Sequence, residues 1–180
     1  MMVRTRMAFV LALGGACAAR MPAQTIRRSQ LATVTQQIAD TRLEILYRRP
    51  VARGRVLFGA LVPFGKLWSP SADSAARLSI STDIVVNGAK LPAGTYGIWA
   101  IPDSTEWTII FNSEATAFHL RYPEGRETLR VRARPIKGDH VESLSFTLPM
   151  VDADSATLHL HWGTTVVPLA IRAASPLGVK

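Results

Sequence analysis

The sequence predicts an all-β fold, a single antiparallel β-sandwich of jelly-roll-like type that is preceded by a cleavable N-terminal signal helix. Three observations predict it. Apolar and polar residues alternate with a period of two in roughly eight to ten short segments, the pattern of strands with one buried face. Gly, Pro and Asn punctuate these segments at short intervals. Beyond the N-terminal segment, no stretch shows the 3.6-residue period of an amphipathic helix.

The composition is that of a globular domain with a basic balance. Apolar residues make up 48% of the 180 residues and charged residues 19%, unlike the composition of disordered chains. The 21 Lys and Arg outnumber the 13 Asp and Glu, for a net charge of +8. This balance favours acidic partners, such as an anionic glycan or an envelope protein. We expect no nucleic-acid partner, because the N-terminus predicts export.

The N-terminus has the three parts of a secretory signal peptide. Arg4 and Arg6 make a basic start, and residues 7–19 (MAFVLALGGACAA) form an apolar core with a small-residue end. As a helix this core is about 20 Å long, short of the ~30 Å hydrocarbon layer, so we expect no transmembrane span in the mature chain. The predicted location is the periplasm or cell envelope. The predicted parts are a signal peptide at 1–19, a flexible leader at 20–31, the β-sandwich at 32–172 and a tail at 173–180.

Cys17 is the only cysteine, and it lies inside the predicted signal peptide. Lipid anchoring at Cys17 is an alternative to simple cleavage, although Gly14 stands where a lipoprotein signal usually has Leu. Cleavage after the cysteine would leave a domain with no disulfide and no thiol nucleophile. Packing alone would then stabilise the domain.

The first part of the domain alternates strands with irregular segments. Residues 32–37 (ATVTQQ) and 42–47 (RLEILY) predict the first two strands. Residues 48–55 contain four arginines, a proline and a glycine, which a central strand does not accommodate. This basic loop is either solvated surface or an anion-recognition loop, since the arginine fork fits carboxylate and phosphate. Residues 56–68 (VLFGALVPFGKLW) predict an irregular apolar crossing under the sheet, and residues 69–76 a polar loop.

Asn87-Gly88 is the clearest local signal in the chain. A type I′ turn needs positive φ at both central residues, and Asn-Gly meets that need best. Residues 96–101 and 107–111 are rich in aromatic and β-branched residues and predict consecutive antiparallel strands near the middle of a sheet. Further strands are expected at 78–81, 83–86, 129–133, 144–148, 158–162 and 166–171, with a long loop at 112–125 and turns at 135–139 and at Gly163.

Several sequence blocks together resemble one family. They are Tyr47-x-Arg49-Pro50, Gly54-Arg55-x-x-Phe58-Gly59, residues 61–68 (LVPFGKLW), Leu91-Pro92-Ala93-Gly94-x-Tyr96, Ile101-Pro102, residues 107–112 (WTIIFN) and Leu158-x-Leu160-x-Trp162. This set, spread over about residues 32–170, resembles the bacterial exported family known as domain of unknown function 2911. The resemblance implies an exported all-β domain and no assigned reaction. The family usually continues after the tryptophan as Arg-x-Gly-Ala-Asn-Glu-Ala, whereas this chain has residues 69–75 (SPSADSA), so a site there would be altered or lost.

Seven side chains form the candidate binding site that we expect at one end of the sandwich: Arg49, Arg55, Lys66, Trp68, Asp73, His119 and Tyr122. The first hypothesis is a noncatalytic binding or interaction module. The second is a hydrolase of an envelope polymer or a small ester or glycan, with His119 as the base and Asp73 orienting it. The third is a purely structural envelope protein. Arg130, Arg132 and Arg134 share one strand face, which is either polar surface or part of a basic patch.

Signals for cofactor or metal chemistry are weak. The chain has no Gly-x-Ser-x-Gly nucleophile elbow and no phosphate-binding glycine loop before a helix. His159 and His161 have a spacing that puts both imidazoles on one strand face, where they could bind Zn²⁺ or Cu²⁺. Their apolar neighbours Leu158, Leu160 and Trp162 claim the buried face, so the histidines should face solvent. We therefore expect no cofactor and no metal.

Overall fold

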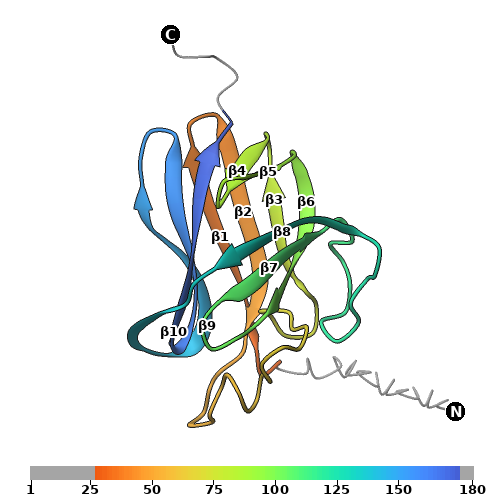
Figure 1. Ribbon diagram of the computed structural model, residues 1–180, viewed down its shortest axis with the longest axis vertical. Helices are drawn as coiled ribbons and strands as arrows, with labels where there is room; N and C mark the ends of the chain where they lie inside the picture. Colours follow the sequence, from red (N-terminus) through yellow and green to blue (C-terminus); the bar gives the residue numbers. More distant parts are fainter. Residues whose placement is uncertain (1–26, 175–180) are drawn as a thin grey trace, which may run out of the picture.

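The computed structural model describes residues 27–174, a range that contains ten β-strands and no helix (Figure 1). The predicted signal peptide at 1–19 lies outside the described residues. The first strand begins two residues before the predicted start of the domain. The strands are β1 (Gln30–Ile38), β2 (Thr41–Arg49), β3 (Ala76–Ile80), β4 (Ile84–Val86), β5 (Ala89–Leu91), β6 (Gly94–Ile101), β7 (Trp107–Asn112), β8 (Glu127–Ala133), β9 (Ile136–Val151) and β10 (Ser155–Ala173).

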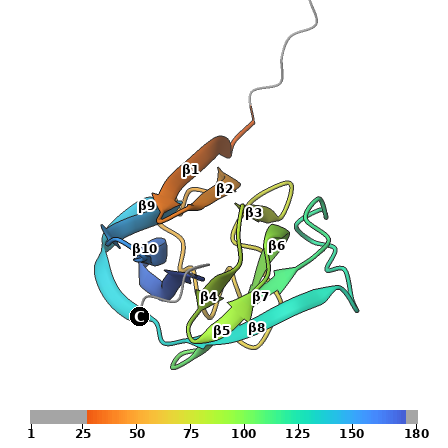
Figure 2. The ribbon, with the colours of Figure 1, turned by 90° about the horizontal axis from the view of Figure 1, so that it is seen from above.

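Two antiparallel sheets enclose the core. Six strands form one sheet in the order β1-β2-β3-β6-β7-β8, and four form the other in the order β5-β4-β10-β9. Seen from above, the six-stranded sheet curves from β1 round to β8 and the other four strands lie against its inner face (Figure 2). The all-β antiparallel architecture predicted from the sequence is confirmed.

The local turn predictions agree with the backbone. Asn87 has φ 47° and Gly88 has φ 84°, so both central residues of the β4–β5 turn have the positive φ that a type I′ turn needs. Strands β6 and β7 pair with each other inside the six-stranded sheet, which confirms the prediction of adjacent strands near its middle. The hairpin that precedes them joins the opposite sheet, where β4 pairs with β10.

The two longest strands are where the sequence prediction fails. Turns were expected at 135–139 and at Gly163. The chain does break between β8 and β9 at residues 134–135, but β9 then runs on through Gly138 and β10 runs on through Gly163. The register of β9 and β10 shifts on both sides of Gly163, which has φ 59°. Gly163 therefore forms a β-bulge that bends one long strand, and glycine suits a bulge and a turn for the same conformational reason.

One apolar core fills the space between the sheets. Alternate side chains of β2, β3, β7 and β10 point inward and are nearly inaccessible to solvent, including Leu43, Ile45, Leu78, Ile109 and Leu169. Burial of each such side chain stabilises the fold by about 1.5–3 kcal/mol. A second, small cluster lies on the outer face of the six-stranded sheet, where the loop after β7 covers Trp99 and Ile110. Because apolar side chains fill the space between the sheets, we look for a binding site at the ends of the sheets and not in the interior.

Candidate functional site

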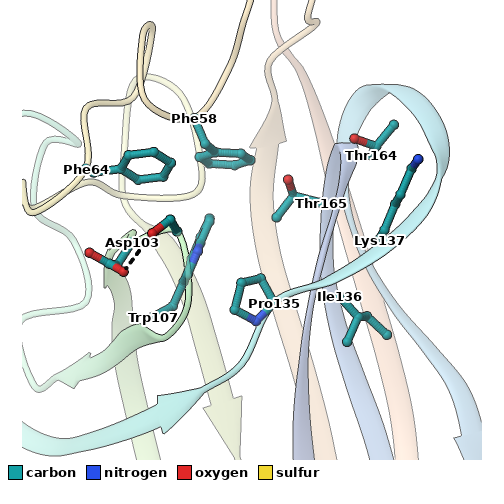
Figure 3. Close-up of a pocket in the computed structure, with 10 residues that line it drawn as sticks. Phe58, Phe64, Asp103, Trp107, Pro135, Ile136, Lys137, Thr164 and Thr165 are labelled. Atoms are coloured by element: carbon teal, nitrogen blue, oxygen red, sulfur yellow. Dashed lines mark hydrogen bonds between the residues drawn. The ribbon is translucent and has the colours of Figure 1, made fainter.

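A pocket of about 240 Å³ opens where the start of β7 and the start of β9 meet the bulge of β10 (Figure 3). The loop between β2 and β3 supplies two of its aromatic side chains, and the β6–β7 turn supplies polar groups. We call this site the aromatic pocket; it is lined by Phe58, Phe64, Asp103, Ser104, Trp107, Pro135, Ile136, Lys137, Thr164 and Thr165. It thus joins four segments that are far apart in the sequence.

The loop that carries Phe58 and Phe64 is held by backbone hydrogen bonds. The Val62 N–H donates to the Leu57 carbonyl at 2.8 Å, and the Gly59 N–H donates to the Val62 carbonyl at 2.9 Å. Gly59 has φ 86°, and a Cβ at this residue would lie 2.9 Å from the ring of Phe64. Glycine is therefore required both for the backbone and for the position of the Phe64 ring. The irregular segment predicted at 56–68 is an ordered wall of the pocket.

A four-ring aromatic cluster forms the back of the pocket. Phe58 packs edge-to-face on Trp107 with ring centroids 4.7 Å apart, and Trp68 stacks on Trp162 at 6.0 Å. Phe58 also meets the rings of Trp68 and Trp162 edge-on. Such pairs contribute about 0.5–1.5 kcal/mol each beyond their buried area, so they stabilise this wall. Trp68, a predicted site residue, supports the pocket from behind.

The polar groups of the pocket lie at opposite ends. Asp103 lies beside Phe64, whereas Lys137 and Thr164 lie on the far side (Figure 3). Asp103 Oδ1 accepts hydrogen bonds from the Thr105 N–H at 3.0 Å and the Thr105 hydroxyl at 3.1 Å. These bonds stabilise the carboxylate and lower the pKa of Asp103 below its usual value. Among the described residues, neither Asp103 nor Lys137 forms an ion pair.

Arg49 and Arg55 are engaged by backbone carbonyls. Arg49 Nε donates to the carbonyl of Leu144 on β9 at 3.1 Å. Arg55 Nε donates to the Ala52 carbonyl at 2.8 Å, and its Nη2 donates to the Val51 carbonyl at 2.7 Å. These contacts give each guanidinium a structural partner. An anion-binding role for this loop stays a prediction. An anion bound there would have to contact the guanidinium groups while they keep these hydrogen bonds to the backbone.

Asp73 and His119 lie close together. The His119 N–H donates to the Asp73 carbonyl at 3.3 Å. Burial lowers the pKa of His119, and the charge of Asp73 opposes this effect more weakly. The Asp73 carboxylate, however, pairs with Arg27 at 2.6 Å and Arg48 at 3.4 Å. No hydrogen bond joins the Asp73 and His119 side chains in the part of the chain that is described.

Tyr122 lies in the small outer cluster. Its ring packs edge-to-face on Trp99 at 5.1 Å, and its hydroxyl donates to Glu127. Burial, and then the bond to Glu127, raise the pKa of Tyr122 to about 12. Trp99 Nε1 is buried and has no hydrogen-bond partner among the described residues. Tyr122 therefore belongs to the loop after β7 and covers the apolar surface of this outer cluster. It does not line the aromatic pocket.

The predicted seven residues thus occupy several places rather than one. Lys66 is exposed and follows Gly65, whose N–H donates to the Pro102 carbonyl at 2.9 Å near the pocket. Sequence reasoning missed Phe58, Phe64, Asp103 and Lys137 as pocket residues. The signals available were two Phe-Gly steps and a Pro-Asp turn, yet only the tertiary fold brings them together.

The histidines of β10 are not part of a metal-binding cluster among the described residues. Within residues 27–174, no group of three or more His, Cys, Asp and Glu side chains is placed to hold a metal ion. His159 and His161 are half-buried on β10, and His161 Nε2 lies 2.9 Å from the Asp139 carbonyl oxygen. Burial, and then the charge of His161, lower the pKa of His159. In this same range there is no helix of the length and apolarity needed to cross a bilayer.

Of the comparisons with known proteins, only the comparison with family models gives a match. Searches of curated proteins and of solved structures return no match. The model of one family matches residues 29–171, which takes in the whole of β1 to β9 and most of β10. Phe58, Phe64, Trp68, Trp107 and Trp162, which form much of the pocket and its wall, all lie in the blocks that carry the resemblance. The chain belongs to the family described as protein of unknown function (DUF2911).

Proposed function

We propose that the protein is an exported, noncatalytic binding module whose ligand site is the aromatic pocket. One observation carries the proposal: three aromatic side chains from two separate segments converge on a concave site whose charged groups, Asp103 and Lys137, form no ion pair with a described residue. Ligand sites are typically concave, mostly apolar and fitted with a few polar groups that fix orientation. The predicted signal peptide adds the expectation that the ligand is met in the periplasm or envelope.

The arrangement of titratable groups favours binding over hydrolysis. The lining of the aromatic pocket includes one carboxylate, that of Asp103, and no histidine. The Asp73 carboxylate is already paired with Arg27 and Arg48, so it is not free to orient His119 as a general base. A hydrolase would need an acid–base pair within reach of one reacting atom. No specific observation favours that alternative.

The test is a screen of small fragments that follows the tryptophan indole N–H resonances by NMR. The fragments are monosaccharides, amino acids, organic cations and carboxylates. We expect binders to shift the resonance of Trp107, and those of Trp68 and Trp162 behind it, and to leave Trp99 unmoved. Trp99 is the internal reference because it lies on the outer face of the six-stranded sheet.

A matched pair of variants locates the site. Phe64 and Phe118 are both exposed phenylalanines, at 43% and 53% of the side chain's full exposure, but only Phe64 lines the pocket. Phe64→Ala should abolish the fragment shifts, whereas Phe118→Ala should leave them unchanged. The proposal is overturned if no fragment binds at millimolar concentration, or if binding depends on Phe118 instead.

A further inference from the structure

We infer that the aromatic pocket binds a small dipolar molecule, one with a cationic group and an anionic group at opposite ends. This inference rests on the proposed function, that the pocket is a ligand site. It adds the chemical class of the ligand. The separation of Asp103 from Lys137 across an apolar middle is the observation that leads to it (Figure 3).

The Asp103 end has the parts of a cation site. All the hydrogen bonds that this carboxylate accepts from described residues go to Oδ1, from Ser104 and Thr105. Oδ2 is left to accept from a ligand. The rings of Phe58, Phe64 and Trp107 lie on the same side of the pocket (Figure 3). Aromatic faces attract organic cations, and aromatic cages with such faces recognise quaternary ammonium groups.

The opposite end has donors that suit an anion. Lys137 extends beside Thr164, and Thr165 lies between them and the aromatic rings (Figure 3). Lys137 makes no ion pair with a described residue. Position 137 pairs with Thr165 in the β9–β10 register, so the lysine stem starts from a fixed strand. An ammonium with neighbouring hydroxyls is a ready donor set for a carboxylate or phosphate.

The size of the pocket selects a compact ligand. A volume of about 240 Å³ equals the share of roughly eight waters in the liquid, at ~30 Å³ each. An amino acid or a betaine fits that space. Because the two charged ends are separated by apolar surface, a neutral sugar would leave Asp103 and Lys137 without charged partners, and a purely anionic ligand would meet the Asp103 carboxylate.

The experiment compares four probes by indole NMR titration: glycine betaine, choline, acetate and glycerol. Glycine betaine carries both charges, choline only the cation, acetate only the anion, and glycerol no charge. We expect glycine betaine to bind at least roughly tenfold more tightly than choline or acetate, since it engages both ends. Binding of glycine betaine no tighter than that of glycerol would overturn the inference.

Two charge variants assign the ends. Asp103→Asn keeps the Oδ1 acceptor of the turn but removes the charge, and should weaken glycine betaine and choline by roughly fivefold to tenfold. Lys137→Gln should weaken glycine betaine and acetate similarly. The controls are Asp152→Asn, whose Oδ1 accepts from the next N–H at 2.8 Å in a distant turn, and Lys90→Gln, which pairs with Asp83. Both controls should leave every affinity unchanged.

The outcomes separate this inference from the proposed function. If probes bind, lose affinity with Phe64→Ala and ignore both charge variants, the pocket is a ligand site but not a dipolar one. The inference then fails and the proposed function stands. If no probe or fragment binding depends on Phe64, both fail.

Discussion

Gly163 shows how a single residue sets the shape of the site. Its φ of 59° lies in the left-handed region, and a Cβ there would lie 2.8 Å from Cδ1 of Leu57. The glycine therefore lets β10 bulge and lets Leu57 pack against the bulge. The next two residues, Thr164 and Thr165, line the aromatic pocket. The conformation of one residue thus places two polar side chains.

Gly163→Ala should lower the free energy of unfolding by about 2–4 kcal/mol. Positive φ costs alanine about 1 kcal/mol, and crowding of Leu57 adds about 1–3 kcal/mol. Gly125→Ala is the matched control, because Gly125 has φ 72° with no atom within 4 Å of the Cβ position; it should lose about 1 kcal/mol. Urea denaturation measures both. Equal losses of stability in the two variants would show that the Leu57 side chain can move aside at no cost in free energy.

At the scale of elements, side chains of β2 connect the two sheets. The Phe146 N–H on β9 donates to the Tyr47 hydroxyl at 3.1 Å, and the two rings meet edge-to-face at 4.9 Å. Arg49 binds the Leu144 carbonyl of the same strand. Strands β2 and β9 belong to different sheets, and the backbone directly after β2 joins them as well, since the Leu144 N–H donates to the Pro50 carbonyl at 2.9 Å.

Arg49→Ala should therefore destabilise the protein by about 1.5–2 kcal/mol, the usual value for a hydrogen bond from a charged donor. Arg53→Ala is the control, since the Arg53 side chain is exposed and only its backbone N–H bonds to Glu142. It should change stability by less than about 0.5 kcal/mol. Thermal or urea unfolding distinguishes the two. An unchanged unfolding midpoint for Arg49→Ala would show that the Arg49 side chain does not stabilise the fold. Only its predicted role in ligand binding would then remain.

At the scale of the molecule, both sheets share one apolar core. Residues of β2, β3 and β7 pack in the same cluster as residues of β4, β9 and β10. Neither sheet could bury its inner face alone, and a sheet with one exposed apolar face is not stable by itself. The two sheets should therefore unfold together.

Native-state hydrogen exchange tests this cooperativity. The slowest amides of β4 and β10 should exchange with the same free energy as those of β6 and β7, equal to the global free energy of unfolding. The loop at 113–126 should exchange faster, because it covers only a small outer cluster. A uniformly lower opening energy for the four-stranded sheet would show two separate units instead of one.

The sequence predicted those features that depend on local chemistry. Asn87-Gly88 specifies its turn by itself, and the alternation in residues 42–47 specifies which side chains are buried. Gly163 was misjudged as a turn because glycine has the same backbone freedom in a bulge. Gly138 is instead a strand residue at a close approach, where a Cβ would lie 2.7 Å from Cγ2 of Val166. The aromatic pocket was not predicted, since Phe64, Asp103 and Lys137 meet only after β6, β9 and the loop at 56–68 are in place. Local sequence patterns do not predict which distant segments come together in the folded protein.

The position of β10 has a consequence for the order of folding. Strand β10 lies between β4 and β9, and it pairs Val86 with Ile171, which are far apart in the sequence. It is also C-terminal to every other described strand. Until the ribosome has made β10, the β4–β5 hairpin has no sheet to join, and such nonlocal pairing is slow to form. The four-stranded sheet can therefore form only after synthesis of the domain is nearly complete.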